Sequence, residues 1–214
     1  MFKLITGNNG RSVYAGYVEN YNASQETFEL TGIEWDKENK KEIERRLFLK
    51  KDIDLPETEL VNGEYIIVTM LPSRKDPDRG TAEEIAKQNQ AIRLQNDKGN
   101  VKIAFIGTVV GKKWNSSGSV LSLSIRGIKA VDGVNIGAPY TYYDRFGDEL
   151  TSYYINISLF KNSKSKIYTA EKGDKDFEKG KKAVFVVAPK ERMYNGKMYQ
   201  NFMLTKYSIP KMEN

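Results

Sequence analysis

The chain has 214 residues, contains neither cysteine nor histidine, and carries 34 Lys and Arg against 28 Asp and Glu, for a net charge of +6. The missing cysteines exclude disulfides and thiolate metal sites, and the missing histidines remove the side chain that most acid-base mechanisms and many metal sites recruit. We therefore expect a cytoplasmic protein that is not an enzyme and uses no cofactor or metal. No apolar run reaches the ~18 residues of a membrane span, so no membrane partner is expected.

The charge is unevenly distributed along the chain. Residues 1–96 carry 14 Lys and Arg against 17 Asp and Glu, a net charge of −3, whereas residues 97–214 carry 20 against 11, a net charge of +9. A basic half favours a polyanionic partner through attraction and counterion release. The same lysines are also consistent with a β-rich protein that uses them only for solubility.

The first half reads as a mostly β domain, because apolar and polar residues alternate between clusters of turn residues. The alternation predicts five strands, at Ser12–Tyr21, Thr27–Trp35, Ile43–Lys51, Glu64–Leu71 and Gln90–Gln95. Between the last two strands, Thr81 followed by Glu83 and Glu84 predicts a short helix with a Thr N-cap and acidic residues in its first turn.

The stretch from Asn96 to Asn100 is a turn cluster without an apolar residue. Such clusters separate folded segments. We therefore predict two domains, a mildly acidic one over residues 1–96 and a basic one over residues 100–210.

The second half repeats the β pattern and adds a helix. Strands are predicted at Val101–Lys113, Val120–Ala130, Leu150–Phe160, Ala183–Tyr194 and Met198–Ile209, with a helix or helical turn within Lys164–Gly180. Asn195-Gly196 joins the last two strands, and this dipeptide supplies the positive φ angles of a type I′ hairpin turn.

Five strands with a helix after the third is the order of an OB-fold barrel. The predicted fold class is thus all-β, with an OB-fold in the C-terminal half. The first half has the same number of strands but only Asp54–Val61 where the helix would lie, so a second OB-like barrel there is the expectation.

OB barrels bind single strands by stacking bases on exposed rings while Lys and Arg follow the backbone. Tyr140, Tyr142 and Tyr143 fall in a predicted hairpin excursion, which contains Gly137, Pro139 and Gly147, between the second and third strands. Aromatic residues in a loop or hairpin are expected at the surface. They are candidates for stacking, with packing against the barrel or another subunit as the alternative.

The sequence of the third strand predicts one buried face and one solvent-exposed face. The period of two places Tyr153, Ile155, Ile157 and Leu159 on a core face, and Tyr154, Asn156, Ser158 and Phe160 on the other. The second set mixes rings with small polar residues. Tyr154 and Phe160 are therefore candidates for stacking.

Two further aromatic residues lie beside basic residues. Trp114 follows Lys112 and Lys113 at the end of the first strand, where it is predicted either to stack or to cover the rim of the barrel. The hairpin around Asn195-Gly196 combines Tyr194 with Lys190, Arg192 and Lys197. Tyr194 is predicted to contact nucleic acid or to stabilise the hairpin through its cross-strand neighbour Met198.

Residues 100–209 resemble the bacterial single-stranded DNA-binding protein family. The resemblance lies in four segments and two single positions. The segments are Asn100–Gly107, which resembles the opening strand, Tyr154–Phe160 in the third strand, and Phe177–Gly180 followed by Val184–Val186. The positions are Tyr140, which stands 14 residues before Tyr154, and Tyr194 in the last hairpin. It implies an OB-fold that stacks bases on the residues at Tyr140, Tyr154, Phe160 and Tyr194. Tyr140 and Tyr154 stand where the family usually has Trp.

The chain also departs from that family. Residues 209–214 lack the acidic tail and terminal Pro-Phe with which the family recruits partners, and the extra N-terminal domain has no counterpart in the usual one-barrel member. The family usually assembles as a tetramer, so by analogy a chain with two barrels is expected to form a homo-oligomer, with a dimer favoured.

We expect a non-enzymatic single-stranded DNA-binding protein of replication or recombination, with little sequence preference. The alternative is an OB-fold module that binds RNA or a protein. A third reading, a metal-dependent nuclease using the acidic run Asp52–Glu59, would need carboxylates that converge from other strands, and the run is better explained as a solvated loop.

Overall fold

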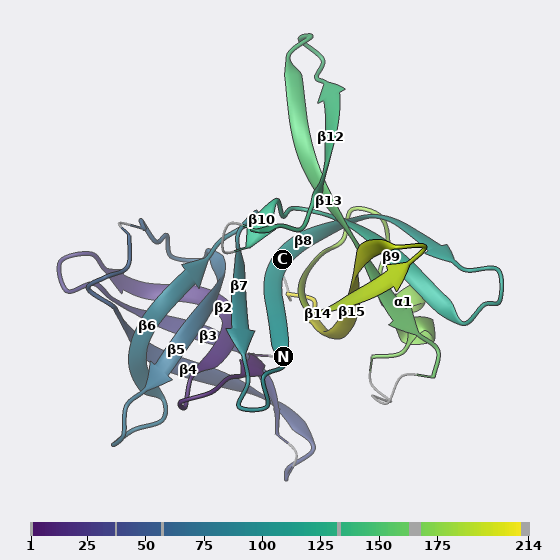
Figure 1. Ribbon diagram of the computed structural model, residues 1–214. Coiled ribbons are helices and arrows are strands. Elements are labelled where there is room, and N and C mark those ends of the chain that lie inside the picture. Colours follow the sequence, from purple (N-terminus) through teal and green to yellow (C-terminus); the bar gives the residue numbers. More distant parts are fainter. Residues whose placement is uncertain (1, 37, 57, 132–133, 163–167, 211–214) are drawn as a thin grey trace. The chain divides into compact units, whose positions relative to one another are not determined.

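The computed structural model describes residues 2–36, 38–56, 58–131, 134–162 and 168–210, and the side chains of residues 134, 135, 192, 194 and 197–200 lie outside this description. The described chain consists almost entirely of β-strands, as the sequence predicts (Figure 1). It divides into two compact units, residues 1–87 with 94–100 and residues 88–93 with 101–214. No helix in these residues is long and apolar enough to cross a membrane.

Unit 1 is built from strands whose pairings close on themselves. Its strands are β1 (Lys3–Thr6), β2 (Ser12–Asn22), β3 (Thr27–Asp36), β4 (Lys41–Lys51), β5 (Tyr65–Pro72) and β6 (Arg79–Ala86). β2, β3 and β4 form an antiparallel meander, β5 pairs with β2, and β6 pairs antiparallel with β5 and parallel with β4. The ring β2-β3-β4-β6-β5 has the strand order of an OB-type barrel.

The core of unit 1 follows from strict alternation along these strands. Phe28 and Leu30 on β3 and Leu47 and Leu49 on β4 are buried, while the residues between them lie on the outer face. Phe2 joins this core from the segment before β1. The inner face is thereby apolar and the outer face polar, as expected for a sheet with one buried face.

The helix predicted at Thr81 is wrong, because these residues belong to β6. Acidic residues after a Thr suit a helix start, but β6 can pair on both of its edges, with β4 and with β5. Ala82 and Ala86, which would suit a helix face, are buried in the barrel. Long-range pairing that closes the ring here overrides a weak local preference.

Unit 2 contains a second closed ring. Its elements are β8 (Val101–Trp114), β9 (Val120–Arg126), β10 (Ala130–Val131), β11 (Val134–Asn135), β12 (Ala138–Tyr143), β13 (Glu149–Phe160), α1 (Ala170–Asp176), β14 (Lys182–Tyr194) and β15 (Lys197–Ser208), and β7 (Ala91–Gln95) spans the boundary between the units. β9 pairs with β8 and β13, β13 pairs parallel with β15, and β14 pairs with β15 and β8. The ring β8-β9-β13-β15-β14 repeats the order of unit 1.

The helix of unit 2 lies after the third strand of the ring, as the sequence predicts. Thr169 caps α1 by accepting a hydrogen bond from the Lys172 amide. Gly173 packs so closely on Leu159 that a Cβ atom would lie 2.5 Å from its Cδ2. The helix is shorter than the predicted range, and residues 164–167 of that range lie outside the described chain.

In the second half, the predicted hairpin turn is present, but the predicted second strand ends early. Asn195 and Gly196 have φ angles of 48° and 71°, which confirms the predicted hairpin turn. The second strand is shorter than predicted, because β9 ends at Arg126. Gly127 follows with a φ of 138°, a conformation that interrupts the strand.

The tight packing of β6 gives a stability test. A Cβ atom on Gly80 would lie 2.4 Å from the backbone oxygen of Leu71, so Gly80→Ala is expected to lower the free energy of unfolding by about 1 to 3 kcal/mol. Chemical denaturation measures this. Gly111→Ala is the control, because a Cβ atom at that residue would meet nothing within 4 Å, and equal stability of the two variants would contradict the β6 assignment.

Tyr207 gives a second test, which depends on pH. Its buried hydroxyl donates to Asp176, and burial raises the pKa of Tyr207 far above the ordinary value of about 10. Above a pH of about 10, Tyr207 loses its hydroxyl proton in the unfolded chain but keeps it in the folded chain. The free energy of unfolding therefore falls as the pH rises through this range. Tyr207→Phe is expected to be less stable at neutral pH but to show a shallower alkaline decline in urea unfolding. A loss of unfolding free energy at alkaline pH as steep as in the parent would refute this. Tyr143→Phe, which removes an exposed hydroxyl, is the control.

Candidate nucleic-acid interface

The outer face of β13 carries the rings that the sequence places there. Ile155, Ile157 and Leu159 are buried, whereas the alternate positions from Tyr154 to Phe160 lie on the outside of the barrel. Phe160 is 42% exposed. Tyr154 and Phe160 are six residues apart on one face, or about 20 Å along the strand.

Small polar and basic residues of the neighbouring strands flank these rings. On β9, Ser122 lies opposite Ser158 and Arg126 opposite Tyr154, and the Ser124 hydroxyl donates to Asn156 Oδ1 over 2.7 Å. On β8, Lys113 lies opposite Ser122. In the described part of the chain, Lys113 and Arg126 have no carboxylate partner, so both cations are available to a phosphate.

The ribbon formed by β12 and the start of β13 extends this face (Figure 1). The two strands pair with each other from Ala138 opposite Tyr154 to Tyr143 opposite Glu149. The rings of Tyr140 and Tyr142 are nearly parallel, with centroids 6.3 Å apart, and Tyr140 meets Tyr154 edge to face at 5.7 Å. The side chains of Tyr140, Tyr142, Tyr154 and Phe160 therefore lie on one side of the ribbon and the barrel, which we call the aromatic face.

Tyr143 lies on the opposite side of the ribbon. Its register position is offset by one from Tyr142, and its hydroxyl donates to Glu149 Oε2 over 3.2 Å. On the same side, Lys129 lies over the Tyr153 ring at 5.3 Å. The structure thus separates Tyr143 from Tyr140 and Tyr142, with which the sequence groups it.

Trp114 and Lys112 are directed toward α1 instead of the aromatic face. Trp114 packs against the barrel core and its indole N–H donates to Asp174 Oδ2 over 3.1 Å. Lys112 forms an ion pair with the same carboxylate at 2.8 Å. Hydrogen bonds from Lys112 and Trp114 hold the pKa of Asp174 below its usual range. This arrangement fits the rim-covering alternative for Trp114.

The basic hairpin lies beyond the barrel on β14 and β15. Lys190 is exposed opposite Asn201, and β14 pairs with β8 only as far as Val187. The backbone of Arg192, Tyr194 and Lys197 lies in this hairpin, with Tyr194 opposite Lys197. Their side chains are outside the described part of the chain.

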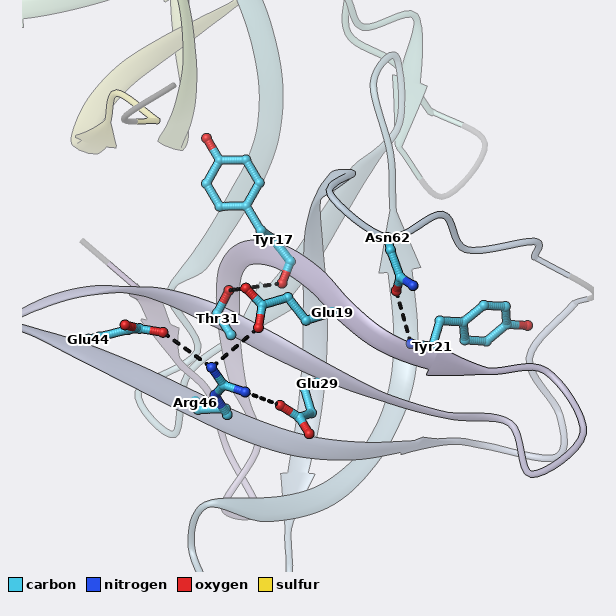
Figure 2. A network of polar contacts seen from close by, with 8 residues as sticks. All are labelled: Tyr17, Glu19, Tyr21, Glu29, Thr31, Glu44, Arg46 and Asn62. Atoms are coloured by element: carbon cyan, nitrogen blue, oxygen red, sulfur yellow. Dashed lines mark hydrogen bonds and ion pairs between the residues drawn. The ribbon is translucent and has the colours of Figure 1, made fainter. Parts of the chain in front are cut away.

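Unit 1 differs from unit 2 on the corresponding face. Figure 2 shows Arg46 on the outside of β4, where its guanidinium contacts Glu29 at 2.6 Å, Glu19 at 3.3 Å and Glu44 at 3.5 Å. The Thr31 hydroxyl also donates to Glu19 over 3.2 Å. Three carboxylates surround one cation here, so this part of unit 1 is unsuited to a phosphate backbone.

The acidic run at the end of β4 forms a loop with local contacts. Asp52 accepts a hydrogen bond from the Asp54 amide, and buried Lys51 donates to the Thr58 carbonyl over 2.6 Å. Among the described residues, no three Asp or Glu side chains converge where they could hold a metal ion.

Two features of the interface were not predicted. Arg126 lies opposite Tyr154, and the alternation in Val120–Arg126 already places Ser122, Ser124 and Arg126 on one face. Phe146 is 75% exposed at the tip of the ribbon, with Arg145 over its ring at 4.7 Å. Nothing in the local pattern distinguishes Phe146 from a loop residue that folds back on the barrel.

No protein-family model matches the sequence, and no curated protein matches it at a significant level. Among solved structures, the small single-stranded DNA-binding protein of Streptomyces coelicolor is 11% identical, with a TM-score of 0.28, over 52% of this chain and 94% of the other. The Thermus aquaticus single-stranded DNA binding protein is 10% identical, with a TM-score of 0.29, over 100% and 96%. Fission yeast Pot1, solved with single-stranded DNA, is 11% identical, with a TM-score of 0.34, over 99% and 87%.

Identity this low with TM-scores below 0.5 does not establish a shared function. The function of this chain must therefore be argued from its own residues.

The position of Trp114 leads to a prediction. Trp114→Phe removes the donor to Asp174 and is expected to reduce stability by about 1 kcal/mol, while the affinity for an oligonucleotide stays unchanged. Thermal melting and a binding titration on the same sample measure the two quantities. Weakened binding with an unchanged melting temperature would instead place Trp114 in the interface.

Proposed function

We propose that the protein binds single-stranded DNA on the aromatic face of unit 2 without acting on it chemically. The observation that supports this most directly is that Tyr142, Tyr140, Tyr154 and Phe160 lie on one side of the ribbon and the barrel. A surface with this many partly exposed rings on one face is expected to have a partner. Unpaired bases offer flat apolar faces to such rings.

Base stacking would supply affinity with little sequence preference. Every base has a flat face, and each stacked base contributes roughly 1 to 3 kcal/mol. The side chains between the rings, Ser122, Ser124, Asn156 and Ser158, are small and polar. They leave room for a strand to lie flat on the sheet and keep the face wet when it is empty.

The cations beside the rings would neutralise the phosphates. Arg126 lies on β9, which pairs with β13, and Lys113 lies on β8, the strand beyond β9, both on the outer side of the barrel. Lys190 and the backbone positions of Arg192 and Lys197 extend the basic character into the β14–β15 hairpin. Duplex DNA, in which the bases are already stacked on one another, would gain only the phosphate contribution.

The stacking proposal is tested by removing two rings. Tyr154→Leu combined with Phe160→Leu is expected to weaken binding to oligothymidylate by about 2 to 6 kcal/mol, without an equal loss of stability, because both side chains lie on the outer face. Fluorescence titration and thermal melting measure the two effects. Tyr143→Leu, on the opposite side of the ribbon, is the matched control and is expected to bind as the parent does.

The same titration at several salt concentrations tests the electrostatic contribution. For a single strand, each phosphate contact contributes about −0.7 to the slope of log affinity against log salt, so Arg126→Gln should make the slope shallower by about that amount. Failure of the parent protein to bind oligothymidylate at low salt would refute the proposal. Tighter binding to RNA of equal length would favour the RNA-binding alternative.

The cellular role and the assembly state are further parts of the proposal. The family resemblance of residues 100–209 supports a role in replication or recombination and a homo-oligomer, with a dimer favoured because each chain has two barrels. Sedimentation of the full chain, with and without oligothymidylate, measures the assembly state.

A further inference from the structure

Unit 1 has a groove on the outside of its barrel. The groove has a volume of about 380 Å³ and lies where β3, β4 and β6 adjoin the end of β2. Its lining includes Asn20, Glu29, Phe48, Lys50 and Arg79. An aromatic ring, two cations and an amide thus border one hollow.

The aromatic ring of the groove belongs to Phe48 and lies on the outer face of the barrel. Leu47 and Leu49 are buried in the barrel, so Phe48 between them faces outward and is 40% exposed. Phe48 and Arg79 are partners in the parallel pairing of β4 and β6, and the guanidinium lies 5.1 Å from the ring centre. Arg79 also meets Asp76 at 3.4 Å, in an exposed ion pair of the kind that contributes little to stability and that a phosphate can replace. Lys50 follows two residues later on the same exposed face.

A second exposed ring of unit 1 shows what is particular about Phe48. Trp35 is 57% exposed on the outer face of β3, but its cross-strand partner is Glu42 and Glu44 follows on the same side of β4. Arg79 lies over the Phe48 ring, whereas the cross-strand partner of Trp35 is a glutamate. A nucleotide, which combines a flat base with a negative phosphate, suits the Phe48 groove and is repelled at Trp35.

The surrounding charges also limit what the groove accepts. Glu29 lines the groove, and its carboxylate contacts Arg46 at 2.6 Å, so this cation offsets part of the acidic charge there. Beyond Arg46 the face is bordered by Glu19 and Glu44 (Figure 2). A phosphate chain that continued along β4 would meet these carboxylates, so the site is suited to one nucleotide or two.

We propose that this groove is a second, short subsite for single-stranded DNA. One base stacks on Phe48, its phosphate lies against Arg79 and Lys50, and the Asn20 amide is placed to hydrogen-bond the base edge. The inference rests on the proposed function of unit 2. It gives the acidic unit a role in binding that its net charge would not suggest.

Photochemical cross-linking of the full chain tests the subsite. The probe is an oligothymidylate of about 30 nucleotides, longer than one OB barrel covers, with 5-iodouracil at successive positions. Stacked 5-iodouracil cross-links to aromatic side chains, so we expect adducts on the tryptic peptide 47–50, which contains Phe48, in addition to adducts in unit 2.

Variants of the groove sharpen the result. Phe48→Leu is expected to abolish the adduct on peptide 47–50 and to weaken affinity for the long oligonucleotide by about ten-fold, the value of one stacked base. Arg79→Gln keeps the ring and is expected to reduce the yield of the same adduct. Trp35→Leu is the matched control and should leave both quantities unchanged, and circular dichroism verifies that each variant is folded.

The outcomes separate this inference from the proposed function. Adducts confined to unit 2, with parent-like affinity for Phe48→Leu, would overturn the subsite and leave binding by unit 2 intact. An equal loss of affinity in Trp35→Leu would also overturn it, because the effect would then not depend on the cations. Absence of both binding and adducts in either unit would refute the proposed function itself.

Discussion

Closure of each strand ring by one parallel pairing is the constraint on which the rest of the structure depends. In both units the third and fifth strands of the ring run side by side in the same direction, β4 with β6 and β13 with β15. These pairings turn an open meander into a ring with an apolar inside. Once the inside is fixed, every alternate residue must face outward, and the outer faces become available for recognition.

The two barrels use this outer face in different ways. In unit 2 the third strand has rings separated by small polar residues, and a ribbon continues the same face beyond the barrel with Tyr140 and Tyr142. In unit 1 the third strand has Arg46 among three carboxylates, with Phe48 and its cations at one end. We propose that the same backbone order supports a long stacking surface in one unit and a short one in the other.

Charge pairing distinguishes the units more sharply than net charge does. In unit 1, Arg11 is bound to Glu83, Arg45 to Asp78 and Arg46 to Glu29, each at 2.6 or 2.7 Å. These guanidinium groups are already occupied by carboxylates. In unit 2, Lys112 is likewise paired with Asp174, whereas Lys113, the next residue, faces the aromatic side. The position of a Lys or Arg along a strand decides which face of the sheet it lies on. That face decides whether the side chain meets a carboxylate or is free to contact a phosphate.

The sequence by itself determined most of the ring strands, the type I′ turn and the outer face of β13, because these follow from alternation or turn residues within a short segment. Tertiary structure decided the rest. β6 is a strand because it closes a ring, against its local helix signals, and Trp114 contacts Asp174 because a distant helix covers that end of the barrel. Tyr143 was separated from Tyr142 by pairing register, which local composition does not encode. Local patterns fix which face a residue occupies, and only the folded chain decides what that face meets.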